Sequence, residues 1–430
     1  MRRPTRTVLA VVAASCLAGA LATPGSVAAA ATPLMSAALS APVSCPGAPA
    51  AGVSLPSLAP RDPLISELGL DQAWQLTTGS GVTVGVVDSG VSPASPKLAG
   101  AVDLGQTYRV TDTKAVYTHA ADGRVDCEGH GTAVAGIIAG RSAAGDDRVS
   151  GVAPSARIYP VAIQGEIAQA PAPLIGAAIR DAAQHARVLN LSFAQTTDSV
   201  DIRSAVQYAL ARGVVVVAAA ANDGGVPAEA GAKWYPAAYP GVIAVTAVNS
   251  DGSEQEGAST GSWITLAAPG ESLTSEPRGG RGYVTVTGTS FATAVVSGTV
   301  ALMLARDTSL TPAAVKAQLE RTAVTPGDGA RDNTVGYGTV DPFAALTESR
   351  PASGARSAQG SVAVQALPTP KPSSTRPVVV AVGVGLLALA LLVAAGAITV
   401  RVGRRRGWHA GRLPAHTVRQ APEPHPAQLE

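Results

Sequence analysis

Four residues that could carry out chemistry stand where predicted strands end or predicted helices begin: Asp88, His130, Asn222 and Ser290. Taken one at a time, each has a common structural explanation. An Asp after a strand is usually a turn or cap residue, and Asn-Asp-Gly is a good turn sequence by itself. A Ser at a helix start is usually an N-cap. A lone His is usually a surface residue, but the glycines on both sides of His130 would let other backbone come close.

Together the four residues supply the parts of an acyl-transfer reaction. Ser290 would attack a carbonyl carbon, and His130 would take the serine proton, because the hydroxyl is too weakly acidic by itself. Asp88 would fix the imidazole tautomer and stabilise the imidazolium. The Asn222 side-chain amide and the Ser290 backbone N–H would bind the oxyanion.

The elements that must position these residues alternate between strands and helices. Apolar runs that read as buried on both faces predict strands over residues 82–87, 157–162, 188–191, 214–221, 242–247 and 264–268. Helical patterns cover residues 132–139, 174–185, 202–212 and 291–306. This alternation predicts an α/β fold with a twisted, mainly parallel sheet and helices on both faces, in which sites lie beyond the carboxyl ends of the strands. Two other histidines are weaker candidates for a base, since His119 is expected in a polar loop and His185 ends a helix.

Composition excludes some classes of function. Hydrophobic residues make up 46% and charged residues 14% of the chain, which is enough apolar material for a large core. Without its basic ends the chain is mildly acidic, so it lacks the basic stripe that nucleic-acid binding requires. No acidic cluster argues for calcium, and we predict no metal and no cofactor.

Two apolar segments indicate the compartment. Residues 1–31 combine arginines, an apolar stretch and small residues, as a secretory signal peptide does. Residues 378–400 carry no charge and predict one C-terminal transmembrane helix. The basic tail 401–430 follows, and the positive-inside rule places it in the cytoplasm and the preceding domain outside. The Pro-, Ser- and Ala-rich residues 349–377 predict a linker.

Three motifs resemble those of the subtilisin-like serine proteases, or subtilases: VGVVDSGV, GHGTAVAGIIAG and GTSFATAVVSG. The chain order Asp, His, Ser is also that of this family. The resemblance implies a subtilisin-like peptidase domain over residues 69–348 that hydrolyses protein or peptide substrates through an acyl-enzyme. It also implies that Asp88, His130 and Ser290 are catalytic and that Asn222 belongs to the oxyanion hole.

The wider architecture resembles the mycosins, which are membrane-anchored proteases associated with type VII secretion. This resemblance implies a cell-membrane protein with its catalytic domain outside the cytoplasm and with type VII secretion subunits as partners. It implies that residues 32–68 form a permanent N-terminal extension, tied to the loop before His130 by a Cys45–Cys127 disulfide. Two free thiols are the alternative. The polar stretch 105–126 would be a mycosin-like insertion.

Some positions depart from the subtilase pattern. Ala221 stands where the family usually has Gly, and Ala294 where it usually has Pro. Phe193 and Ala194 stand where the substrate-pairing strand often has Gly, which leaves peptide docking and specificity open. Two alternatives to a dedicated secretion protease remain: a scaffold subunit whose proteolysis is dispensable, and a general surface protease.

Overall fold

The structure is a computed structural model of the 430-residue chain. It describes residues 45, 52–54, 60–110, 117–120, 122–142, 148–222, 232–325, 330–348 and 375–407. Two compact units, Met1–Arg350 and Pro351–Glu430, divide the chain and are described separately.

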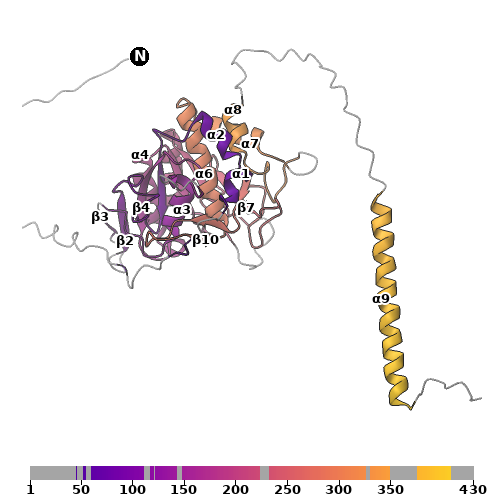
Figure 1. The fold of residues 1–430 in the computed structure, drawn as a ribbon. Coiled ribbons are helices and arrows are strands. Elements are labelled where there is room, and N and C mark those ends of the chain that lie inside the picture. Colours follow the sequence, from indigo (N-terminus) through magenta and orange to yellow (C-terminus); the bar gives the residue numbers. More distant parts are fainter. Residues whose placement is uncertain are drawn as a thin grey trace, which may run out of the picture. The chain divides into compact units, whose positions relative to one another are not determined.

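The first unit is built on an eight-stranded sheet with the order β3-β2-β4-β1-β5-β6-β7-β8 (Figure 1). Its strands are β1 (Thr83–Asp88), β2 (Gln106–Val110), β3 (Tyr117–Ala120), β4 (Arg157–Ile163), β5 (Val188–Leu191), β6 (Val215–Ala219), β7 (Ile243–Val248) and β8 (Leu266–Pro269). All neighbouring strands are parallel except β3, which runs antiparallel to β2. The carboxyl ends of seven strands therefore meet at one edge of the sheet.

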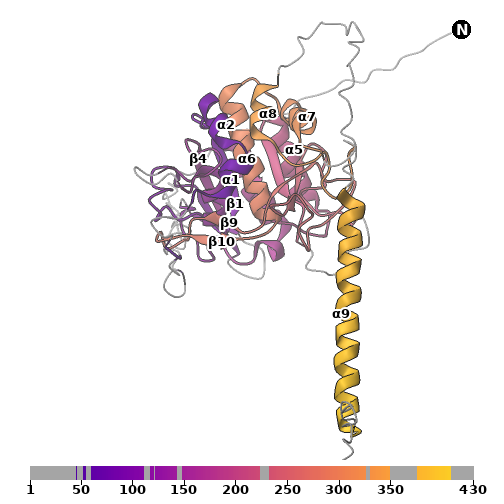
Figure 2. The same cartoon turned by 45° about the vertical axis from the view of Figure 1, so that its right-hand side comes forward.

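Helices cover both faces of this sheet. Helices α3 (His130–Ala139) and α6 (Thr289–Arg306) pack on one face, and α4 (Ala172–His185) and α5 (Val200–Ala211) pack on the other. The remaining elements of this unit are α1 (Pro63–Glu67), α2 (Leu70–Leu76), the 3-10 helix η1 (Ile167–Gln169), α7 (Pro312–Thr322), α8 (Pro342–Thr347) and a two-stranded sheet of β9 (Leu273–Ser275) and β10 (Val284–Val286). Figure 2 shows α1, α2 and α8 near α6.

The strands are apolar throughout because each face of the sheet has its own core. Val84 and Val86 of β1 belong to the core under α3 and α6, whereas Val87 belongs to the core under α4 and α5. Gly85 also faces this second core, where an added Cβ would lie 2.8 Å from Cδ2 of Leu189. The predicted α/β fold, with a mainly parallel sheet and helices on both faces, is confirmed.

The six predicted strands and four predicted helices are all present, with ends shifted by a few residues. The placement of His119 in a loop was wrong, because His119 lies in β3. Strands β2 and β3 occupy the polar stretch 105–126 and extend the sheet at one edge. Their sequences are more polar than those of the central strands, since the edge strand β3 and its neighbour β2 do not need to be buried on both faces.

The second unit contains one long helix, α9 (Thr375–Arg405), and the predicted span 378–400 lies inside it (Figure 2). Another helix, α6, has the length and apolarity to cross a membrane, but 83% of its apolar window is buried in the first unit. We therefore assign α6 to the core of the domain. The predicted signal peptide, most of the linker and residues 408–430 lie outside the described residues.

Candidate active site

A cavity of about 390 Å³ lies at the carboxyl ends of β1, β5 and β6, and all four predicted site residues line it. Asp88 is the last residue of β1, and Asn222 follows β6. His130 is the first residue of α3, and Ser290 is the second residue of α6. The topology of the parallel sheet thus brings together residues that are up to about 200 positions apart in the sequence.

Asp88 and His130 form a close pair. The Asp88 carboxylate is buried, and its Oδ1 lies 2.7 Å from Nδ1 of His130. The same oxygen accepts a hydrogen bond from the backbone N–H of Ser89 at 2.7 Å. The helix can start this close to β1 because residue 131 is glycine: an added Cβ would lie 2.1 Å from the carbonyl oxygen of Gly90. The contact with Asp88 therefore fixes the orientation of the imidazole ring through Nδ1 and leaves Nε2 for other partners.

A second buried carboxylate, Asp126, holds the loop that leads into α3. Its Oδ1 accepts hydrogen bonds from Ser89 Oγ at 2.9 Å, Glu128 N at 3.1 Å and Gly129 N at 2.7 Å. Its Oδ2 accepts from the Thr132 backbone at 2.9 Å and from the Thr132 hydroxyl at 2.6 Å. Asp126 was not predicted as a site residue, although an acidic residue just before a helix start is a known capping signal.

Charge around the imidazole favours its protonated form. Burial alone would lower the pKa of His130, but the negative charge and hydrogen bond of Asp88 oppose burial. The charges of Asp126 and Glu128 add to this effect. The sum raises the pKa of His130 from 6.5 to about 9. The imidazole becomes a neutral base only in alkaline solution.

Ser290 is buried at the amino end of α6, where the helix N–H groups have no acceptor inside the helix. Its Oγ donates a hydrogen bond to the carbonyl oxygen of Ser192 at 3.2 Å. The Ser192 hydroxyl donates in return to the Ser290 carbonyl at 2.9 Å. Within the described residues no hydrogen bond joins Ser290 to His130. The next residue, Phe291, packs its ring against the imidazole with 5.3 Å between ring centroids, so α3 and α6 meet at this point.

Asn222 faces the start of α6. Its Oδ1 accepts a hydrogen bond from the Thr289 backbone N–H at 2.9 Å, which directs the amide NH₂ group away from that contact. The preceding residue, Ala221, has a φ of 88°, a left-handed conformation that glycine adopts more readily. The Thr289 side chain is fully buried, and its Oγ1 has no hydrogen-bond partner in the part of the chain that the structure describes. Donors of Asn222 and of the α6 N-terminus thus converge on the cavity.

The N-terminal extension is joined to the same region. Cys45 and Cys127 are bonded through their sulfur atoms, with 5.0 Å between their Cα atoms. Farther along the extension, Val53 pairs with Tyr283 through two backbone hydrogen bonds of 2.8 Å. The extension is therefore attached by the disulfide three residues before His130 and by backbone hydrogen bonds, and its end, with Leu64, Ile65 and Leu68, packs into the core.

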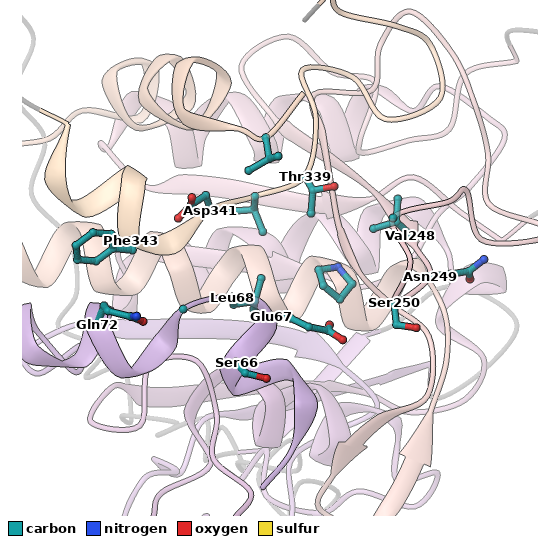
Figure 3. Close-up of a pocket in the computed structure, with 15 residues that line it drawn as sticks. Ser66, Glu67, Leu68, Gln72, Val248, Asn249, Ser250, Thr339, Asp341 and Phe343 are labelled. Atoms are coloured by element: carbon teal, nitrogen blue, oxygen red, sulfur yellow. The ribbon is translucent and has the colours of Figure 1, made fainter. Parts of the chain in front are cut away.

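A second, larger cavity of about 510 Å³ lies between the ends of α1 and α8 and the segment after β7 (Figure 3). Its walls include Glu67, Ser250, Asp341 and Phe343, and none of the four predicted site residues. Volume alone would therefore choose the wrong cavity. The convergence of a carboxylate–imidazole pair with a serine at a helix start distinguishes the smaller one.

Comparisons with known proteins agree with this geometry. Residues 79–338 match the subtilase family. Mycosin-3 of Mycobacterium tuberculosis is 32% identical, over 85% of this chain and 89% of the relative. The crystal structure of MycP1 from Mycobacterium smegmatis matches with a TM-score of 0.58 and 31% identity, over 70% of this chain and 89% of that one.

A chain in the structure of an intact ESX-5 inner membrane complex matches with a TM-score of 0.60 and 28% identity. It covers 83% of this chain and 94% of its own length. The family match covers more than half of the chain, and the fold and the sequence relatives agree with it. The chain therefore belongs to the subtilase family of serine proteases, among its mycosin-like members.

Proposed function

We propose that this chain is an endopeptidase in which Ser290 is the nucleophile, His130 the general base and Asp88 the residue that orients the base. The observation that carries the proposal is one cavity in which a 2.7 Å Asp88–His130 pair lies with Ser290 and Asn222. Membership of the family supports the activity, serine proteolysis, and the geometry supports this assignment of roles to residues.

The reaction follows from the positions of the protons. The Nδ1–H of His130 donates to Asp88, which leaves the lone pair of Nε2 to accept the proton of Ser290 Oγ. The serine hydroxyl must first break its hydrogen bond to the Ser192 carbonyl and turn toward the imidazole. Catalytic hydrogen bonds of this kind often form only when substrate binds. Ser290 Oγ then bonds to the scissile carbonyl carbon, and the Asn222 amide and the Ser290 N–H stabilise the oxyanion.

Collapse of this intermediate releases the amine product, which takes the proton from His130. The acyl group stays on Ser290 until water, deprotonated by His130, attacks it and regenerates the hydroxyl. Neither step requires a group from outside the chain other than water.

The direct test is labelling of the full-length chain in detergent with a fluorophosphonate, which reacts with activated serines. The wild type should be labelled, and Ser290→Ala should not. Ser250→Ala is the matched control, because Ser250 lines the second cavity (Figure 3). This variant should be labelled at Ser290 as strongly as wild type. Labelling of Ser290→Ala, or no labelling of folded wild type, would contradict the assignment.

We also propose that the chain is anchored in the cell membrane by residues 378–400, with the catalytic domain outside the cytoplasm. The support is the long apolar helix α9, which ends in Arg404 and Arg405, since such residues favour the cytoplasmic side. An externally added protease should digest the catalytic domain of intact spheroplasts and spare a tag on the C-terminal tail.

Association with a type VII secretion complex is the second candidate role. It is favoured by the ESX-5 complex neighbour, whose match covers 83% of this chain against 70% for the MycP1 crystal structure. The full-length chain should co-purify with the membrane subunits of such a complex. If Ser290→Ala also co-purifies and the complex stays intact, the chain has a scaffold role that does not need proteolysis. Absence of co-purification would favour a general surface protease.

A further inference from the structure

Two carboxylates beyond the proposed triad line the active-site cavity: Glu128 and Glu166. Glu128 lies two residues before His130, and Glu166 directly precedes η1. Both side chains are exposed to the cavity and solvent. Partial burial raises the pKa of Glu128, and the charges of Asp126, Asp88 and Glu166 raise it further, although His130 opposes them. The two glutamates are therefore close enough for their negative charges to repel each other.

Apart from His130, no basic side chain among the described residues of the cavity wall offsets this charge. Among the described residues that line the cavity there is no Lys or Arg, and neither glutamate forms an ion pair. Glu166 accepts a hydrogen bond of 2.6 Å from the Gln169 amide, which is a neutral donor. Arg278 packs near Gly129, with its Cδ 3.7 Å from the position of an added Cβ, but it lies outside the cavity lining.

The rest of the cavity suits a long side chain with a polar end. Phe193, Ala219, Ala221 and Trp234 give the wall an apolar surface. Thr289 also lines the cavity, and its Oγ1 is buried without a hydrogen-bond partner among the described residues, so an unsatisfied polar atom lies in the cavity wall. Lys and Arg combine an aliphatic stem, which packs on apolar walls, with a cationic head that carboxylates bind.

We propose that this cavity selects peptides with a lysine or arginine side chain next to the scissile bond, and that Glu128 and Glu166 recognise the cation. The inference rests on the proposed function and adds its substrate class. The two carboxylates act on substrate binding and orientation, so they determine specificity and take no part in proton transfer.

The test uses the full-length chain in detergent and a set of matched fluorogenic peptides. Each position on either side of the scissile bond is varied among lysine, the neutral isostere norleucine and glutamate. We expect one position at which the lysine peptide has a kcat/KM about tenfold or more above that of norleucine, the size of one charge-assisted interaction. The advantage should shrink in 1 M NaCl, because part of the attraction is screened.

Variants locate the cause of the preference. Glu128→Gln and Glu166→Gln should each lower the lysine-to-norleucine ratio, and Glu128→Lys should shift the preference toward the glutamate peptide. The ratio cancels any change in the pKa of His130, because both peptides meet the same enzyme. Glu67→Gln is the matched control, since Glu67 is also an exposed wall carboxylate but belongs to the second cavity (Figure 3). Its ratio should equal that of wild type.

The outcomes separate the two proposals. Fluorophosphonate labelling of each variant shows that its site is folded and reactive. If kcat/KM for the lysine and norleucine peptides differs by less than twofold, or if their ratio is the same in wild type and in both glutamine variants, the specificity proposal is overturned. The proposed protease function would still stand. Failure to hydrolyse any peptide, together with no labelling of wild type, overturns the proposed function and the specificity with it.

Discussion

His130 lies among three carboxylates whose combined charge outweighs the effect of burial on its pKa. Burial disfavours the imidazolium, whereas Asp88, Asp126 and Glu128 favour it and raise its pKa to about 9. Since only the neutral imidazole accepts the proton of Ser290, kcat/KM should rise with pH and reach half its maximum near pH 9. A pH profile measured with a neutral peptide checks this value.

Glu128→Gln should move that midpoint to lower pH, because one of the charges that raise the pKa of His130 is removed. Glu67→Gln should leave it in place. The same pKa predicts the direction of stability: a group whose pKa is raised on folding stabilises the fold below its unfolded value, 6.5, and this contribution is lost as pH rises through about 9. A midpoint near pH 6.5 in wild type would contradict the effect of the carboxylates.

Ala221 is a residue whose type and backbone conformation disagree. Its φ of 88° costs an alanine about 1–2 kcal/mol relative to glycine. Glycine at position 221 would remove this cost, but part of the gain in stability is offset by the greater freedom of glycine in the unfolded chain. Ala221→Gly should therefore raise the free energy of unfolding by roughly 0.5–1 kcal/mol. Chemical denaturation measures the difference.

The neighbouring substitution Ala220→Gly is the control. Ala220 is fully buried and has no positive φ, so glycine there should lower the free energy of unfolding by about 0.5–1 kcal/mol. If both glycine variants are destabilised alike, the left-handed conformation of Ala221 is not a source of strain.

At the scale of elements, Asp126 connects the end of β1 to the start of α3. It is the acceptor for Ser89 beside Asp88 and for the Gly129 and Thr132 groups that begin the helix of His130. Asp126→Ala would leave these buried donors without an acceptor, at about 1–3 kcal/mol for each one that water cannot reach. We expect a loss of at least about 3 kcal/mol in unfolding free energy and a fall in kcat.

Asp126→Asn tests the same connection with less disruption, since one oxygen is retained. Its unfolding free energy and kcat should lie between those of wild type and Asp126→Ala. Asp122→Asn is the control, because Asp122 is only partly buried and its ion pair with Arg124 is exposed, which makes it worth about 1 kcal/mol or less. Equal losses in the Asp122 and Asp126 variants would show that the network does not hold the helix start.

The central elements could be predicted because their sequences are determined by local physics. Strands β1, β5 and β6 are apolar on both faces because helices cover both faces of the sheet. A continuous apolar run is visible in the sequence even when the segments that pack against it are not known. The edge strand β3 and its neighbour β2 lack it, because polar residues are tolerated toward the edge of the sheet. Helix α7 carries a local signal in its Thr311 N-cap and following proline, yet it is largely polar and buries only Val315 and Leu319, so its apolar pattern is weak and the prediction omits it.

The candidate site divides in the same way. Asp88, His130, Asn222 and Ser290 were found from strand ends, helix starts and motif order, and the structure brings them into one cavity. The hydrogen bond between Ser290 and the Ser192 carbonyl could not be predicted, because it joins segments 98 residues apart through backbone atoms. The position of Glu166 in the same cavity as Glu128 has the same origin: it depends on the turn after β4, which no local pattern specifies.

At the scale of the whole molecule, the Cys45–Cys127 bond ties the N-terminal extension to the loop before His130 across 82 residues. Closing a loop of that length removes entropy from the unfolded chain equivalent to about 4–5 kcal/mol. The β-bridge of Val53 with Tyr283 adds two backbone hydrogen bonds to the middle of the extension, whereas its end is held separately by Leu64, Ile65 and Leu68 in the core, so the covalent bond should supply most of the attachment of the part around Cys45.

Removing the bond should therefore lower the melting temperature of the full-length chain by on the order of 10 °C. The loss should appear in wild type on addition of reductant and in a Cys45→Ser, Cys127→Ser double variant without it, and reductant should not lower the double variant further. Because Asp126 and Asp88 still hold His130, the folded double variant should keep most of its peptide hydrolysis at low temperature. A wild-type melting temperature that reductant does not change would mean that the two cysteines do not brace the fold, and that the extension is held by its other contacts.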